Sequence, residues 1–111
     1  ITIVFLNNTL KLLQEHYTKN NYREIKACLY GKKEFSKYFI DRIFFPEILS
    51  ASVVHVKSVS CPNALIDLHS HPINHCLASK KDVENFKELK AVNPDILMVI
   101  MCSKNRFAVY E

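Results

Sequence analysis

Residues 64–82 read ALIDLHSHPINHCLASKKD, a stretch in which a strand, a break and the start of a helix follow one another. Residues 64–71 fit a strand, because this largely apolar run ends at a proline. Residues 79–90 carry apolar side chains three or four positions apart, the spacing of one helical face. Ser79 is a natural N-cap, and Asp82 three positions later resembles a capping box in which Asp replaces Glu. We therefore predict a strand that leads through a loop into a capped helix.

The remaining elements follow from hydrophobic periodicity and from the positions of Pro, Asn and Gly. A first helix is expected to be capped by Asn7 and Asn8 and to stop at residues 20–21, and residues 31–33 are expected to form a turn. The element order predicts a single α+β domain over residues 1–111, with a mixed or antiparallel sheet flanked by two main helices. Besides the strand at 64–71, the expected strands cover residues 1–6, 24–30, 38–45, 52–57, 95–102 and 107–110.

Composition and charge argue against several classes of protein. Apolar residues make up 49% and charged residues 23% of the chain, the balance of an ordinary soluble globular protein. Apolar runs stay short of the roughly 18 residues that a membrane-spanning helix needs, so no membrane span is expected. The net charge of +4 is spread over separated lysines, so no nucleic-acid partner is expected. The short apolar opening has no basic leader, so we expect a first strand rather than a signal peptide. A cytoplasmic location is therefore expected.

The four cysteines show no CxxC spacing. A reduced set of thiols, each in a buried apolar position, is the expected state of a cytosolic protein. Disulfides are an alternative if the source is a hyperthermophile. A bond between Cys76 and Cys102 is one hypothesis, because one residue precedes the second helix and the other lies on the strand that follows it.

The two histidines of residues 64–82 alternate along the predicted strand. Residues two apart on a strand point to the same face, so His69 and His71 present both imidazoles on one side. Asp82, in the first turn of the following helix, is placed to complete a His/His/Asp set. Two nitrogen ligands and one oxygen ligand, with a fourth position for water, are the usual plan of a catalytic zinc site. A plain polar strand face remains the alternative, as does a closed structural site completed by His75 or Cys76.

The spacing His69-x-His71-Pro72-x6-Ser79-x2-Asp82 resembles the signature of the JAMM, or MPN-plus, zinc metallopeptidases. That family also has a glutamate in an early strand, within a Glu-x-x-small-x-Leu-x-Gly-like segment, and residues 24–31, EIKACLYG, match it. The order of strands and helices is similar as well, and the likeness covers nearly the whole chain. The sequence looks most similar to the minimal prokaryotic or archaeal members.

The resemblance implies a role for each matched position. His69, His71 and Asp82 would bind Zn²⁺, and Glu24 would act as general base on the attacking water. Ser79 would hydrogen-bond the oxyanion or the water, beside its capping role.

Neighbouring positions depart from the family's pattern or invite another role. Ile66 stands where the family often has Gly, and Asp67 stands where it has an apolar or small residue. Asp67 shares the face of the histidines and could orient an imidazole, contact a substrate amine or compete as a ligand, of which we favour the first two. Ser70 points to the opposite face, so we expect it to form supporting hydrogen bonds rather than to be a nucleophile. A thiol-protease site at Cys76 is not expected, because no further constellation supports it.

By resemblance, the expected reaction is hydrolysis of an isopeptide or peptide bond at the C-terminus of a ubiquitin-like or sulfur-carrier protein. The alternative is a non-catalytic MPN-type scaffold, although scaffold members lose the ligands that this chain keeps. A DNA-associated domain of the same superfamily is disfavoured by the absence of a basic tract. The sequence does not set the oligomeric state.

Overall fold

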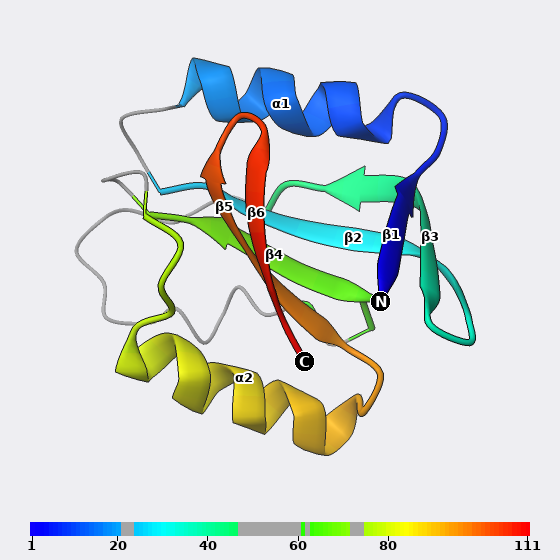
Figure 1. Ribbon diagram of the computed structural model, residues 1–111, viewed down its shortest axis with the longest axis vertical. Helices are drawn as coiled ribbons and strands as arrows, with labels where there is room; N and C mark the ends of the chain where they lie inside the picture. Colours follow the sequence, from blue (N-terminus) through cyan, green and yellow to red (C-terminus); the bar gives the residue numbers. More distant parts are fainter. Residues whose placement is uncertain (21–23, 47–60, 62, 72–74) are drawn as a thin grey trace.

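The computed structural model describes residues 1–20, 24–46, 61, 63–71 and 75–111. The described residues form two helices and six strands (Figure 1). The first helix follows one strand, and the second helix follows three more strands and precedes the last two. The elements are β1 (Thr2–Phe5), α1 (Thr9–Lys19), β2 (Lys26–Glu34), β3 (Lys37–Phe44), β4 (Ile66–Ser70), α2 (Lys80–Val92), β5 (Leu97–Ser103) and β6 (Arg106–Tyr110). The predicted strand over 52–57 lies outside the described residues.

All six strands belong to one mixed sheet with the order β1-β3-β2-β4-β5-β6. The β1–β3 and β4–β5 pairs are parallel, whereas the β2–β3, β2–β4 and β5–β6 pairs are antiparallel. Strand β4 therefore lies inside the sheet, between β2 and β5. The prediction of a small α+β fold with a mixed sheet and two helices is confirmed.

The two helices pack on opposite faces of the sheet (Figure 1). Leu13 and Tyr17 of α1 join the largest buried cluster, to which β4 contributes Ile66 and Leu68. Phe86 of α2 packs instead with Ile96 and Met98, next to β5. Because side chains alternate along a strand, the even-numbered residues of β4 face α1 and its odd-numbered residues face the side of α2.

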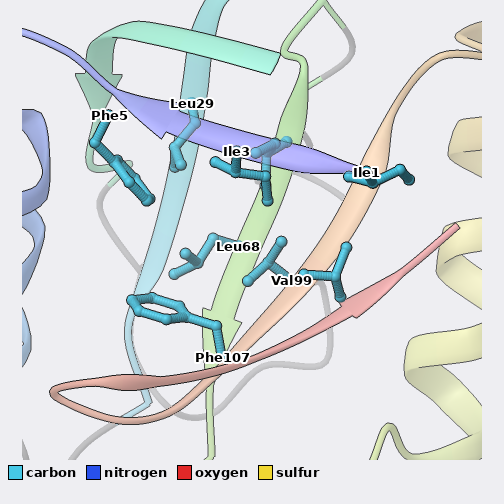
Figure 2. Close-up of a pocket in the computed structure, with 9 residues that line it drawn as sticks. Ile1, Ile3, Phe5, Leu29, Leu68, Val99 and Phe107 are labelled. Atoms are coloured by element: carbon cyan, nitrogen blue, oxygen red, sulfur yellow. The ribbon is translucent and has the colours of Figure 1, made fainter. Parts of the chain in front are cut away.

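An apolar cavity of about 290 Å³ lies on the α1 face of the sheet. Figure 2 shows β1 and β6 on either side of it, with side chains of the inner strands between them. Phe5 and Phe107 approach from the two edge strands, and their ring centroids are 6.3 Å apart. Leu68 also lines this cavity, so the cavity lies on the opposite side of β4 from His69.

The expected turn at residues 31–33 is wrong, because β2 runs on to Glu34 and turns only at Phe35. Gly31 marks an irregularity in the pairing of β2 with β3. A Cβ at this position would overlap the carbonyl oxygen of Phe39 and would lie 2.8 Å from its carbonyl carbon. Glycine is therefore needed here for the close approach of two backbones, not for a turn.

The start of α1 is predicted correctly, but its side-chain cap is not. Asn8 occupies the N-cap position, as expected, with a left-handed backbone, φ 64°, and its side chain makes no capping bond. Asn7 is left-handed too, with φ 53°. Asparagine tolerates this conformation, so the pair reverses the chain between β1 and α1 without a side-chain bond to the helix.

The expectation of reduced thiols is wrong as well, because the four cysteines form two disulfides, Cys28–Cys61 and Cys76–Cys102. The hypothesis of a Cys76–Cys102 bond is confirmed, and their Cα atoms are 5.0 Å apart. The fold brings both pairs within the Cα separation that a disulfide requires, which residue spacing alone does not reveal. In the described part of the chain, neither helix has the length and apolar character to cross a membrane. The cytoplasmic location stays a prediction.

Replacing Gly31 with Ala is expected to lower the free energy of unfolding by about 1–3 kcal/mol, because the new methyl group requires β2 and β3 to separate. Urea unfolding followed by circular dichroism measures this change. Lys32→Ala is the control, since this exposed neighbour should change stability by no more than about 0.5 kcal/mol. Equal stabilities of the two variants would contradict the close backbone approach.

Replacing both Cys28 and Cys61 with Ala is expected to lower the free energy of unfolding by about 3 kcal/mol, because the bond closes a long loop in the unfolded chain. Urea unfolding again gives the value. Alkylation of the unfolded wild type without reductant first checks that the bonds have formed. Labelling of all four cysteines in that experiment would contradict both disulfides.

Candidate metal centre

Strand β4 carries His69 and Asp67 on the face that is turned away from α1. His69 is 8% exposed and Asp67 is 7% exposed, and both are odd-numbered residues of β4. His71 follows the strand directly, and its side chain is 9% exposed. The β2 and β5 neighbours fix the register of β4, pairing His69 with Lys26 on one side and with Ile100 on the other. The orientation of the histidine pair is therefore set by the core of the sheet.

The capping box at the start of α2 orients Asp82. Ser79 Oγ accepts a hydrogen bond from the Asp82 amide at 3.0 Å, and Asp82 Oδ2 accepts one from the Ser79 amide at 2.9 Å. The predicted box is thus confirmed, with Asp in the place of Glu. Burial opposes ionisation of Asp82, but the Ser79 amide and the nearby His69 outweigh it and lower the pKa of Asp82 below its ordinary value. Asp82 is therefore a ready anionic ligand.

The two histidines and Asp82 converge on one point. His69 Nε2 lies 3.3 Å and His71 Nε2 lies 3.0 Å from the same oxygen, Asp82 Oδ2. The ligand atoms of the three residues all lie within 4.8 Å of one another. His71 Nε2 is aligned to hydrogen-bond the carboxylate, whereas His69 Nε2 is buried and has no hydrogen-bond partner among the described residues.

This arrangement fits a small divalent cation. A buried nitrogen without a partner is costly, and a metal bond would satisfy it. Tetrahedral ligands at about 2.0–2.1 Å from zinc are separated by roughly 3.4 Å, close to the distances between the imidazole nitrogens and Asp82 Oδ2. Two imidazoles and a carboxylate are also a donor set that suits zinc. The described residues thus include three groups that could hold one metal ion.

Glu24 and Ser79 lie at the border of this cluster. Glu24 precedes β2 and is exposed. Ile25, which follows Glu24, and Ser70, which precedes His71, are joined by two hydrogen bonds. Continuation of the β2–β4 register therefore places Glu24 opposite His71. Glu24 therefore lies along the edge of the histidine face. Ser79 Oγ is an acceptor in the capping box, so its hydroxyl proton can still be donated to a third group.

The residues around the histidines have clear partners. Ser70 Oγ accepts the amide of Ile25 at 2.9 Å, which ties β4 to β2 and fits the supporting role expected of it. Asp67 forms an ion pair with Lys26 at 2.6 Å, and both side chains are largely buried. Lys26 was not predicted from the sequence as part of the site. It lies two residues after Glu24, so the alternation of a strand places both side chains on one face. This pairing is not among the roles considered for Asp67, which stay predictions.

His75 and Cys76 bear on the alternative sites. His75 Nδ1 lies 3.2 Å from His71 Nδ1, on the side of the imidazole away from Asp82. His75 therefore contacts a ligand residue and does not join the three-residue group. Cys76 is held in a disulfide, so it is neither a fourth thiolate ligand nor a protease nucleophile.

Comparisons with solved structures place the fold. A Jab1/MPN domain protein from Archaeoglobus fulgidus superposes with a TM-score of 0.65 at 20% identity, over 100% of this chain and 89% of that one. A protein from Desulfitobacterium hafniense superposes with a TM-score of 0.56 at 17% identity, over 96% of this chain and 80% of that one. No family model and no curated protein sequence matches the chain. The chain thus has an MPN-like fold, and within it a His-His-Asp group that is compatible with metal binding.

The wild-type protein is expected to retain about one zinc ion per chain after dialysis, and His69→Ala to retain little, because it removes one of three protein ligands. Elemental analysis of the two proteins measures this. His16→Ala is the control, because His16 stacks on Phe45 away from the cluster and its loss should leave the metal content unchanged. Equal metal content in wild type and His69→Ala would contradict the site.

Proposed function

We propose that this protein is a zinc-dependent peptidase of the JAMM type, which hydrolyses an isopeptide or peptide bond at the C-terminus of a ubiquitin-like or sulfur-carrier protein. The observation that supports this most strongly is the convergence of His69, His71 and Asp82 on one point within an MPN-like fold. The Nε2 atom of His69 adds to it, because this atom is buried and makes no hydrogen bond among the described residues, and a metal bond would satisfy it.

The three ligand residues would hold the ion through the two Nε2 atoms and Asp82 Oδ2. When bound, zinc lowers the pKa of a coordinated water and polarises the carbonyl group that is to be cleaved. The chain itself supplies orientation. The β4 register fixes His69, and the capping box fixes the Asp82 carboxylate, so little rearrangement is needed to form the site.

Glu24 is proposed as the general base. Its carboxylate takes a proton from the attacking water as the water oxygen bonds to the carbonyl carbon. When the carbon–nitrogen bond breaks, the same carboxyl group gives that proton to the leaving amine. The exposure of Glu24 and its register opposite His71 support this role, because the base must reach solvent, substrate and the ligand face together.

Ser79 is proposed to stabilise the negative charge on the carbonyl oxygen or to orient the water. Its oxygen is engaged by the Asp82 amide, and its hydroxyl proton can point to the reacting groups. A hydrogen-bond donor held in this way by the helix start needs no reorganisation during the reaction.

The substrate class rests on the resemblance of the motif to the JAMM signature. A ubiquitin-like protein ends in an extended tail, and such a tail could reach the site past the exposed Glu24 beside the sheet. The proposed partner is therefore a small protein with a free or conjugated C-terminal tail.

Glu24→Gln is expected to lower kcat by about a hundredfold or more while the protein still binds zinc, because the amide cannot accept the proton. Cleavage of fusions that carry a ubiquitin-like or sulfur-carrier protein, together with metal content, measures both effects. Glu34→Gln is the control, since it changes an exposed residue at the far end of β2.

Wild-type protein that binds zinc and cleaves no such fusion would contradict the proposed substrate class. Wild-type protein that binds no metal would contradict catalysis and favour the non-catalytic scaffold. Full activity of Glu24→Gln would contradict the role of Glu24 alone.

A further inference from the structure

The loop that precedes α2 is held by the last residue of β6. Tyr110 Oη donates a hydrogen bond to the carbonyl oxygen of Cys76 at 2.8 Å and accepts one from the amide of Ala78 at 3.1 Å. The hydroxyl group thus bridges two backbone positions of residues 75–79. This segment lies between His71 and Asp82, two of the three residues of the candidate metal centre.

The position of the Tyr110 hydroxyl is fixed by packing. Its ring lies against the buried cluster of Phe86, Ile96 and Met98, and Ala78 packs against the same cluster. The ring therefore packs against residues of both α2 and β5, and this packing holds the hydroxyl oxygen next to the loop.

A second connection joins the same loop to the same hairpin. The disulfide Cys76–Cys102 links the loop to β5, the partner strand of β6. The disulfide ties the side chain of Cys76, and Tyr110 binds its carbonyl oxygen, so one residue is held twice. The hydrogen bond to Ala78 is the contact that the disulfide cannot supply, because it acts two residues closer to α2.

Ala78 directly precedes the helix cap. The next residue, Ser79, holds the Asp82 carboxylate through its amide and the Asp82 amide through its hydroxyl oxygen. A displacement of Ala78 would move the Ser79 amide, and with it the orientation of Asp82 Oδ2 towards the histidines. Contacts that orient metal ligands from outside commonly change metal affinity by about 10–100-fold.

We propose that Tyr110 is a positioning residue of the metal centre, which raises its metal affinity by holding Ala78, and through Ser79 the ligand Asp82, in the orientation that faces His69 and His71. This inference rests on the proposed metal site. It adds to that site a residue of β6, which lies outside the motif that defines the ligands.

Tyr110→Phe tests the proposal, because it removes only the hydroxyl group and leaves the packed ring. Zinc affinity measured by competition with a chromophoric chelator is expected to fall roughly tenfold. The visible absorption of the Co²⁺-substituted protein, which reports ligand geometry, is expected to change in shape as well.

Tyr38→Phe is the matched control. Tyr38 also donates its hydroxyl to a backbone carbonyl, that of Asp95 at 3.0 Å, but it does so away from the ligand loop. Its zinc affinity and Co²⁺ spectrum should equal those of the wild type. A Tyr110→Phe protein that matches Tyr38→Phe in both measurements would overturn the proposal, whereas a wild type without zinc affinity would overturn the metal site itself.

A measurement on the unaltered protein covers the case in which Tyr110→Phe folds poorly. If holding Ala78 favours metal binding, then metal binding must favour the contact of Tyr110 with Ala78 to the same extent, because coupling between equilibria is reciprocal. Hydrogen exchange of the Ala78 amide is therefore expected to slow several-fold when zinc is added. Exchange at an unchanged rate, with zinc bound, would count against the role of Tyr110.

Discussion

The alternation of side chains along β4 is the constraint on which the rest of the structure depends. The even-numbered residues of this strand pack in the core beneath α1, whereas its odd-numbered residues, Asp67 and His69, lie on the other face. A shift of the strand by one residue would exchange the two sets. Such a shift is opposed from both sides, because β4 is paired with β2 over residues 66–69 and with β5 over its whole length. The chemistry of the site therefore depends on the packing of apolar residues that never contact it.

The face that carries the site is stabilised differently from the face under α1. Among the described residues, twelve buried ones form the cluster on the α1 face, whereas the opposite face holds two clusters of three. Both disulfides lie on this second side, where Cys28 is paired with Asp67 across the sheet and Cys102 follows Ile100 on β5. The buried pair of Lys26 and Asp67 adds a polar contact. Covalent and polar links thus supplement the apolar contacts near the site, since polar ligand residues occupy positions that core residues would otherwise fill.

Much of the fold was predictable from local signals. The hydrophobic spacing of α2, its capping box and the alternation of the two histidines each involve residues close together in the sequence, and each matches the structure. The failures have a different origin. Gly31 is required by Phe39 on another strand, and the disulfides join residues 26 and 33 positions apart, so only the tertiary fold reveals these contacts. Lys26 was missed for the same reason, because its partner Asp67 lies on the neighbouring strand.

Asp82 has two separate roles in this structure, only one of which belongs to the capping box. Asp82 accepts a hydrogen bond from the amide of Ser79, the residue that caps the helix, and it also faces the histidines. A protein with this fold that bound no metal would still gain stability from an aspartate there, since helix caps contribute about 1 kcal/mol. Selection for stability alone could therefore preserve this position. His69, whose buried Nε2 makes no hydrogen bond among the described residues, is the better marker of a metal site in proteins with this fold.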